Sequence, residues 1–346
     1  MSYKQTFLWA VDNFLENNKK QQMIKEAALW IKKGEVIAFP TETVYGLGAN
    51  ALDEQAVRKI FEAKGRPSDN PLIVHIAEAE QLNDLVLQVP SVAKKLIEQF
   101  WPGPLTIILK KKEAVAESVT AGLDTVAVRM PDHPVALELL KEAGVPVAAP
   151  SANLSGKPSP TNGEHVYHDL KGRIAGILDA GGTGVGVEST VLDCSSDVPV
   201  LYRPGGVTVE EIEAVVGQVK IDPSLKSKDE APLSPGMKYT HYSPNGSLTL
   251  VCNRMQIPIL LEEAKSQGKR TGVLTTEENQ DFYEADVVVS CGKRSDLATV
   301  AHKLYQSLRK FDEEKAEVIF SEIFPSEEMG IAIMNRLEKA AGGNVI

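Results

Sequence analysis

The sequence predicts an α/β protein with two domains: a larger domain with a mixed, twisted sheet, then a smaller Rossmann-like domain. Three observations lead to this prediction. Short apolar strands outnumber helices over the first ~215 residues, and strands alternate with helices after residue 247. Between them, residues 222–247 hold four prolines and no hydrophobic period. We therefore expect domains at 1–215 and 248–346, joined by a proline-rich linker at 216–247, and 346 residues suffice for two domains.

The elements of the first domain follow from short apolar runs and from helical spacing. Residues 21–33 place four apolar side chains on one helical face, and Gly34 stops that helix. Residues 41–50, TETVYGLGAN, read as a loop, and Asp53 is the expected N-cap of a helix over 53–64. Further helices are expected at 133–143 and 207–219, and strands at 35–40, 71–77, 105–111, 125–131, 145–153, 172–181, 189–195 and 198–205.

The second domain has a cleaner pattern. Strands are expected at 247–253, 270–276, 285–291 and 316–322, and helices at 256–267, 296–311 and 329–341. This alternation predicts a small parallel sheet with helices on both faces.

Composition narrows the function classes. The net charge of −10 argues against non-specific binding to nucleic acid or to an anionic membrane. No run approaches ~18 apolar residues, so we expect no membrane span. The three cysteines are isolated, which favours reduced thiols and a cytoplasmic protein.

Two cations stand on a stiff loop in this acidic chain. In EAKGRPSDNPLIVH, residues 62–75, Lys64 and Arg66 flank a glycine, and His75 ends an apolar run after Asn70. The plain alternative is a solvated charge pair at a helix end and a structural core histidine. A histidine at a strand end near two cations also suits a polar substrate pocket, here one for a polyphosphate.

Small polar residues cluster after two other strands. PSANLSGKPSPT, residues 150–161, offers Ser151, Asn153 and Ser159 after a buried strand, where open α/β sheets bind ligands. Ser189 lies in the glycine-rich stretch 179–190, at the start of the next strand. Arg203 stands at a strand end before two glycines, where its planar guanidinium suits phosphate or carboxylate. Each stretch alone could be a surface loop or hairpin, but together they favour an anion site.

Other chemistries fit less well. Gly46, Gly48 and Ala51 match a dinucleotide fingerprint, but the helix cap comes five residues past Gly48 and no acidic residue ends the next strand. His165 and His168 lack a third ligand of fitting spacing, so no dedicated metal site is expected. No Walker A motif or nucleophile elbow occurs.

The motifs together resemble the YrdC-like family, the L-threonylcarbamoyladenylate synthases, in their long two-domain form. The matching stretches are FPTETVYGLG, KGRPSDNPLIVH, WPGPLTIIL, VAVRMPDHP, APSANLSGKPSPT, GVESTVLD and YRPGG. They span about residues 25–210, and SPGMKYTHYSP matches the family's linker. The resemblance implies a YrdC-like domain at 1–215 and a nucleotidyltransferase activity.

That resemblance also implies a reaction. Threonine takes up CO2 or bicarbonate to give a carbamate, which attacks the α-phosphate of ATP and releases pyrophosphate. A transferase complex then passes the threonylcarbamoyl group to the tRNA adenosine beside the anticodon; direct tRNA binding is compatible with this scheme and is not required. Mg²⁺ is expected to be carried with ATP rather than by a protein cage.

The family's site residues carry over by position. The resemblance assigns Lys64 and Arg66 to catalysis. Threonine is expected at Thr43, His75, Arg129, Ala149 and Ser189, with Arg129 facing its carboxylate. ATP is expected at Arg66, Asn70, Thr125, Ser151, Asn153, Ser159, Arg203 and Tyr242. Residues 234–244 are expected to fold over the triphosphate as a lid.

Three alternatives stay open at this point. A cation-lined surface could bind RNA without turnover, which would show a steep salt dependence. The hypothesis of a carbamoyltransferase predicts extra domains and cysteine clusters of the zinc-binding type. A dinucleotide enzyme would bind NAD.

Overall fold

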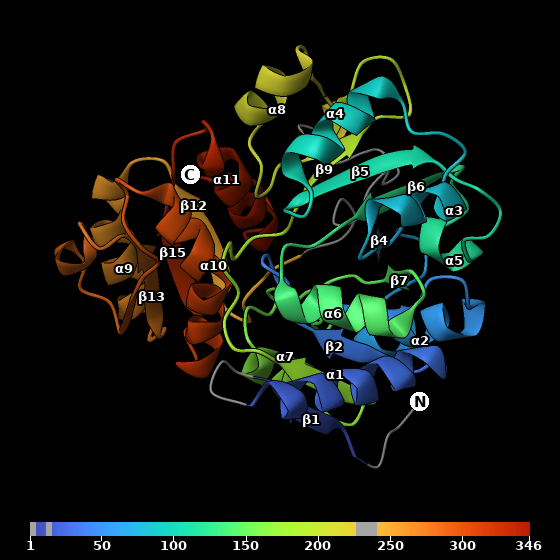
Figure 1. Ribbon diagram of the computed structural model, residues 1–346. Helices are drawn as coiled ribbons and strands as arrows, with labels where there is room; N and C mark the ends of the chain where they lie inside the picture. The colour runs from blue at the N-terminus through green and yellow to red at the C-terminus, as the bar shows by residue number, and fades with distance from the viewer. Residues whose placement is uncertain (1–4, 12–15, 226–240) are drawn as a thin grey trace. The chain divides into compact units, whose positions relative to one another are not determined.

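The chain divides into two compact units (Figure 1), and the computed structural model describes residues 5–11, 16–225 and 241–346. The first unit comprises Met1–Ser155, Pro160–Gly184 and Glu188–Lys238. The second comprises Gly156–Ser159, Val185–Val187 and Tyr239–Ile346. Each unit has its own sheet, which confirms the predicted two-domain α/β fold.

The first unit is built on a mixed sheet of eleven strands among the described residues, in the order β1-β8-β2-β3-β7-β4-β6-β5-β9-β10-β11. Five neighbouring pairs are parallel, such as β4 with β6, and five are antiparallel, such as β5 with β6. The strands are β1 Phe7–Ala10, β2 Ile37–Phe39, β3 Gly46–Asn50, β4 Ile73–His75, β5 Leu105–Lys110, β6 Thr125–Arg129, β7 Val147–Ala148, β8 Gly176–Asp179, β9 Thr190–Asp193, β10 Val200–Arg203 and β11 Lys220–Ile221.

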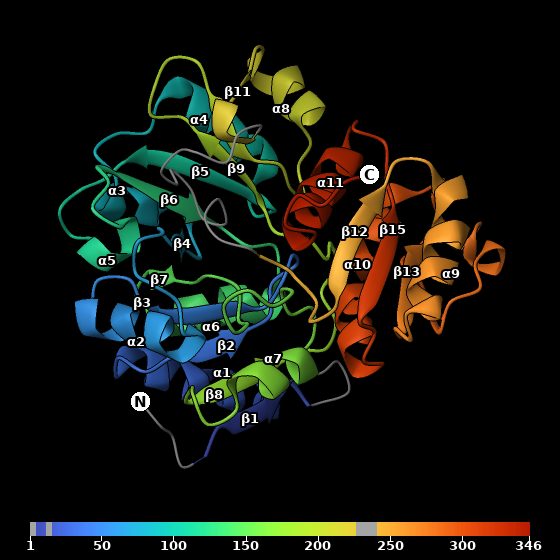
Figure 2. The same ribbon diagram turned by 180° about the vertical axis from the view of Figure 1, so that it is seen from behind.

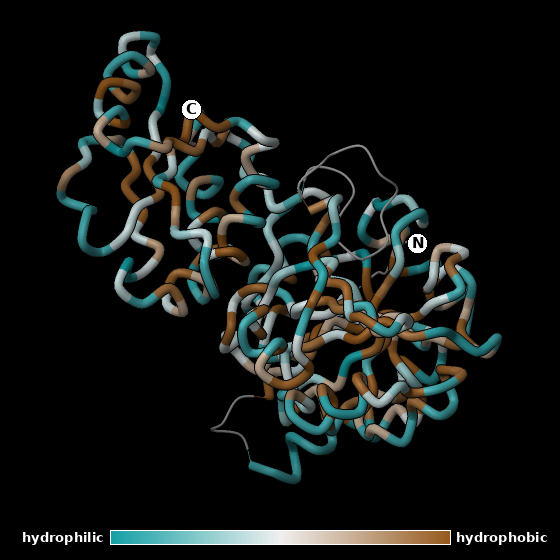
Figure 3. Tube along the Cα trace, turned by 90° about the horizontal axis from the view of Figure 1, so that it is seen from above, coloured by the Kyte–Doolittle hydropathy of each residue, from teal (hydrophilic) through white to brown (hydrophobic). Residues whose placement is uncertain are grey.

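Helices cover this sheet because their apolar faces fit its two hydrophobic layers. The helices are α1 Asn17–Lys32, α2 Glu54–Lys64, α3 Leu82–Leu85, α4 Ser91–Phe100, α5 Glu117–Thr120, α6 Pro134–Ala143, α7 Gly163–Leu170 and α8 Val209–Val216. Helices α1 and α6 pack side by side (Figures 1 and 2). Ile24 and Ile31 of α1 and Leu139 and Leu140 of α6 belong to one hydrophobic cluster. Hydrophobic stretches run through the interior of this unit, which carries the N label in Figure 3.

The expected loop at 41–50 is wrong in its second half, since Gly46–Asn50 forms β3, paired with β2 and β7. The glycines are needed for close packing. A Cβ at Gly48 would lie 2.7 Å from Phe39 Cε1 and 2.8 Å from Val147 Cγ1. The two glycines of the dinucleotide-like motif therefore allow strands to approach. Strand β1 and helices α4 and α7 were not anticipated.

The second unit is a four-stranded parallel sheet in the order β12-β15-β13-β14, as the alternating pattern predicts. Its strands are β12 Ser247–Val251, β13 Thr271–Thr275, β14 Val287–Ser290 and β15 Val318–Glu322. Its helices are α9 Ile257–Ser266, α10 Leu297–Glu313 and α11 Met329–Ala340. Helix α9 covers one face of the sheet, and α10 and α11 cover the other (Figures 1 and 2).

The expected cap of α2 is confirmed. Asp53 Oδ1 accepts hydrogen bonds from the backbone N–H of Gln55 at 2.9 Å and of Ala56 at 3.2 Å. Gly65 ends the helix in the left-handed conformation with φ of 62°. The cap at Asp53 and the turn at Gly65 thus define where α2 begins and ends, and Lys64 and Arg66 stand at its C-terminal end.

Asp53→Ala should lower the free energy of unfolding of the first unit by about 1 kcal/mol, because two helix N–H groups lose their acceptor. The measurement is urea unfolding followed by tryptophan fluorescence, since Trp9, Trp30 and Trp101 all lie in the first unit. Asp53→Asn keeps a side-chain acceptor and should stay close to the parent. Equal loss in both variants would contradict a capping role.

Candidate active site

A buried ammonium group joins two of the sequence motifs. Lys64, the last residue of α2, is 3% exposed. Its Nζ donates to the carbonyl oxygens of Ser151 at 2.5 Å and Asn153 at 2.8 Å, and to Asn153 Oδ1 at 3.2 Å. The structure therefore brings together the Lys-x-Arg and Ser-x-Asn motifs, which lie 87 residues apart in sequence.

The surroundings of Lys64 disfavour its charge. Burial lowers the pKa of Lys64 well below its ordinary value, and neighbouring Arg66 lowers it further. Asp169 and Glu188 act in the opposite direction. An anion placed beside Lys64 would favour its protonated form for the same electrostatic reason.

Arg66 and Asn70 form the next part of the loop. Arg66 Nη2 lies 3.4 Å from the carbonyl oxygen of Asn70. The Asn70 side chain is fully buried, and neither its Oδ1 nor its Nδ2 has a hydrogen-bond partner among the described residues. Such a buried, unpartnered amide is costly unless a ligand satisfies it. A pocket of about 480 Å³ is lined by Arg66 and Gly65 with the outer side chains of α2, and its lining does not include Asn70.

Arg129 organises a second group of residues at the end of β6. Its Nη1 donates to Thr43 Oγ1 at 2.9 Å and its Nε to the carbonyl of Gly103 at 3.2 Å. Its Nη2 lies 2.6 Å from Glu42 Oε1 in an ion pair that is almost fully buried. Glu42 Oε2 is buried and has no hydrogen-bond partner among the described residues.

Glu42 was not among the predicted site residues, although it stands in the motif FPTETVYGLG. The signal was present: Glu42 is the single charged residue in that stretch, between Thr41 and Thr43. A lone carboxylate beside a buried strand needs a cationic partner, and Arg129 is that partner.

His75 lies beside Arg129, because β4 and β6 pair in register at these two residues. Burial, and then the charge of Arg129, lowers the pKa of His75 to about 3. Its Nδ1 lies 3.2 Å from the carbonyl oxygen of Ile73, and its ring meets Phe39 edge-on. His75 is therefore a neutral imidazole at physiological pH.

Ser189 and Arg203 form a third group. Ser189 Oγ lies 2.7 Å from Thr106 Oγ1, a residue the sequence analysis did not select. Arg203 donates from Nη2 to Ser189 Oγ at 3.1 Å and from Nε to the Ser189 carbonyl at 3.0 Å. The backbone of Ala149 joins β4, since its N–H donates to the Ile73 carbonyl.

Three predicted site residues come from the start of β6 or from the second unit. Thr125 stands at the start of β6, four residues before Arg129 and about 13 Å from it along the strand. Ser159 and Tyr242 belong to the second unit, where both are buried and Tyr242 packs on Tyr305 at 5.1 Å. Residues 234–240 of the expected lid lie outside the described residues.

Two absences apply to the part of the chain that the structure describes. No group of three or more His, Cys, Asp or Glu side chains there could hold a metal ion. None of its helices is both long and apolar enough to cross a membrane.

Comparison with known proteins identifies the family. The family model Sua5_yciO_yrdC, described as "Telomere recombination", matches residues 30–205. The model Sua5_C, "Threonylcarbamoyl-AMP synthase, C-terminal domain", matches residues 207–342. The chain is 59% identical over 341 residues to the threonylcarbamoyl-AMP synthase of Bacillus subtilis (strain 168), covering 98% of each chain.

An archaeal relative agrees in sequence and in structure. The threonylcarbamoyl-AMP synthase of Pyrococcus abyssi (strain GE5 / Orsay) is 49% identical over 330 residues, covering 93% of this chain and 95% of that one. The crystal structure of P. abyssi Sua5 complexed with L-threonine matches with a TM-score of 0.93 and 46% identity, covering 99% of each chain.

The fold and these matches define a two-unit transferase that joins a YrdC-like domain to a Rossmann-like one. The chain belongs to the threonylcarbamoyl-AMP synthase family, which confirms the resemblance carried by the motifs.

The neutral state of His75 predicts a pH effect on stability. The folded-state pKa lies below the ordinary 6.5, so the unfolded chain binds the extra proton and stability falls as pH drops below about 6.5. At pH 5 the loss from this group should be about 2 kcal/mol.

The check is tryptophan-monitored urea unfolding at pH 5 and pH 7.5. His75→Asn should show a smaller difference between the two pH values than the parent, while His168→Asn, at an exposed histidine, should not. The imidazole proton resonances of His75 in the intact protein should stay constant from pH 5 to 8. A titration in that range would contradict the assignment.

Proposed function

We propose that this protein makes threonylcarbamoyl-AMP and pyrophosphate from L-threonine, CO2 or bicarbonate, and ATP, for the threonylcarbamoyl modification of the tRNA adenosine next to the anticodon. The observation that carries the proposal is the Lys64 contact with the 151–153 segment, together with the Asn70 amide six residues on, which has no hydrogen-bond partner among the described residues. Cations and unused donors at that place suit the phosphates of ATP. The close similarity to named synthases supports the same reaction.

The ATP side of the site needs alignment and charge neutralisation rather than a protein nucleophile. Lys64 and Arg66 supply positive charge to the phosphates. Arg203, which is hydrogen-bonded to Ser189, adds to this charge. Asn70, Ser151 and Asn153 supply directional hydrogen bonds. The ATP contacts expected of Thr125, and of Ser159 and Tyr242 in the second unit, stay predictions. Mg²⁺ enters with the triphosphate and offsets part of its charge.

Arg129 is the proposed partner of the threonine carboxylate, with Thr43, Ser189, His75 and the Ala149 backbone around the amino acid. Among the described residues, three of its five N–H groups are directed to Thr43, Gly103 and Glu42, which leaves two for a carboxylate. The crystal structure of the P. abyssi relative was solved with L-threonine, which supports a threonine site in this family.

Glu42 gives the first proton transfer an acceptor. Threonine arrives as an ammonium, and only the neutral amine can attack CO2. We place its proton on Glu42 Oε2, a buried oxygen that has no hydrogen-bond partner among the residues that the structure describes. The amine then bonds to the carbon of CO2 and releases a second proton to solvent. The carbamate oxygen attacks the α-phosphorus of ATP, and the bond to pyrophosphate breaks.

The product is a mixed anhydride, so a downstream transferase complex must accept it and pass it to tRNA. Free thiols at all three cysteines, two of them buried, and dependence on ATP favour a cytoplasmic location.

The first experiment measures pyrophosphate release from ATP with and without threonine and with and without bicarbonate. Release should require both, and Arg66→Ala should abolish it, because the phosphates lose a charge-assisted donor. Lys95→Ala, a lysine on α4, is the control and should stay active. Release without threonine would overturn the proposal.

Glu42→Gln should lower the rate at pH 7 by about a hundredfold, since the ammonium loses its proton acceptor. Raising the pH to 9 should restore much of the rate, because free threonine then deprotonates in solution. His133 also faces Glu42. Burial lowers the pKa of His133, and the charge of Glu42 offsets part of that lowering. The variant is therefore compared with the parent across the whole pH range.

Glu35→Gln serves as a matched control, since Glu35 is a carboxylate paired with Lys59 away from these groups. A Glu42→Gln variant whose deficit is the same at pH 7 and pH 9 would contradict proton transfer to Glu42. That outcome would leave it a partner that only positions Arg129.

A further inference from the structure

The second unit has a pocket of its own at the carboxyl edge of its parallel sheet, with a volume of about 560 Å³. Residues that directly follow β12 and β15 line it, among them Cys252 and Ile323. The chain leaves β12 for α9 on one face of the sheet and leaves β15 for α11 on the other (Figures 1 and 2). Such a crevice between oppositely directed connections is where open α/β sheets bind ligands.

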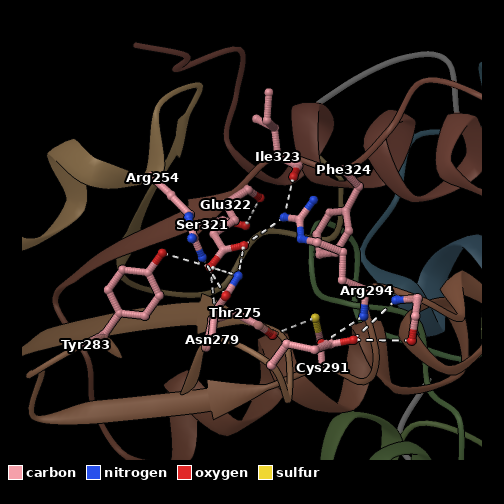
Figure 4. Close-up of polar contacts among 12 residues, drawn as sticks. Arg254, Thr275, Asn279, Tyr283, Cys291, Arg294, Ser321, Glu322, Ile323 and Phe324 are labelled. Atoms are coloured by element: carbon pink, nitrogen blue, oxygen red, sulfur yellow. Dashed lines mark hydrogen bonds and ion pairs between the residues drawn. The ribbon is translucent and has the colours of Figure 1, made fainter. Parts of the chain in front are cut away.

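A buried carboxylate, Glu322, lines this pocket and is surrounded by hydrogen-bond donors (Figure 4). Glu322 is 1% exposed and accepts hydrogen bonds from Thr275 Oγ1 at 2.8 Å and the Tyr283 hydroxyl at 2.7 Å. Asn279 Nδ2 donates to both of its oxygens, at 3.1 and 3.0 Å. Although burial raises the pKa of Glu322, these hydrogen bonds lower it below its ordinary value. Glu322 is thus an ionised, fixed anchor.

The anchor holds one arginine and, through Asn279, a second. Arg294 Nη2 donates to Glu322 Oε2 at 2.7 Å and to the Ile323 carbonyl at 2.9 Å. Arg254 Nη1 donates to Asn279 Oδ1 at 2.5 Å. The guanidinium of Arg294 lies 5.3 Å from the centroid of the Phe324 ring, and that of Arg254 lies 5.5 Å from the centroid of the Phe282 ring.

Both arginines keep unused donors. Among the described residues, neither Nε nor the second terminal nitrogen of Arg254 makes a hydrogen bond, and the same holds for Nε and Nη1 of Arg294. Their orientation is already fixed by Asn279, Glu322 and the two rings, so little side-chain entropy remains to be lost on binding.

The charge and size of the pocket define its ligand. The charged residues that line the pocket are Arg254, Arg294 and Glu322, so the lining has a net charge of +1, whereas the whole chain has a net charge of −10. Two separately oriented guanidinium groups suit the several oxygens of a phosphate better than the two of a carboxylate. The volume exceeds that of an inorganic phosphate ion and lies in the usual range for small-molecule sites, and Val251 and Ile323 add apolar surface.

We propose that this pocket binds a small organic phosphate of nucleotide size, with its phosphate on Arg254 and Arg294. The site lies wholly within the second unit and is distinct from the ATP site proposed for the first.

The pocket carries its own reporter for a test. Cys252 is exposed and lines the pocket, whereas Cys194 and Cys291 are buried. A colorimetric thiol reagent should therefore modify one cysteine quickly in the intact protein. With about 5 mM AMP and a dissociation constant of about 1 mM, that rate should fall about sixfold. Adenosine, which lacks the phosphate, should not slow it.

Variants separate the pocket from general effects. Arg254→Gln and Arg294→Gln should each lose protection by AMP. Arg270→Gln is the matched control, because Arg270 is an exposed arginine of the same unit bound to Glu314 outside the pocket. It should keep full protection.

A last arm separates this site from the first unit. Arg66→Ala should keep protection of Cys252 by AMP while losing pyrophosphate release, so each proposal can fail without the other. Protection that disappears in Arg66→Ala, equal protection by adenosine, or no protection by AMP would each overturn the pocket proposal.

Discussion

The ammonium of Lys64 sits where α2 ends, and it is bonded to oxygens of a segment almost ninety residues further along the chain. Removing a cation from water costs several kcal/mol unless acceptors replace its hydration. Two carbonyl oxygens and an amide oxygen do so here, and the C-terminal end of the helix adds a favourable dipole. The loop at 65–70 and the segment 151–153 therefore take their positions from one another, and the phosphate-facing side of the site depends on that contact.

Arg129 plays a comparable part for the amino-acid side. One guanidinium holds the loop of Thr43, the carbonyl of Gly103 and the carboxylate of Glu42. Both halves of the site are thus organised by a buried cation that also has an assigned place beside a substrate. A substitution at either position removes a binding group and leaves buried acceptors without donors. Loss of activity alone would then not distinguish the two effects.

Much of this arrangement could be predicted from the sequence, because the information was local. Asp53 caps α2, and the four strands of the second unit appear where apolar alternation placed them. The motifs Lys64/Arg66 and Ser151/Asn153, singled out in the sequence, come together in the structure, and their role in a site stays a prediction. Contacts between distant segments were not predictable: Glu42 lies between β2 and β3 and Arg129 at the end of β6, and no local pattern reports that the fold brings the two together. Strand β3 was missed because two glycines usually indicate a loop, and here steric room between strands decides.

The closeness of Gly48 to Phe39 and Val147 has a consequence for how variants of this protein are interpreted. Even an alanine there would push apart the strands that carry the 41–45 and 149–153 segments, without touching one polar group of the site. In a functional screen such a variant would resemble a catalytic-residue knockout. The positions that tolerate substitution are therefore decided by the spacing between backbone segments as much as by the chemistry of the site.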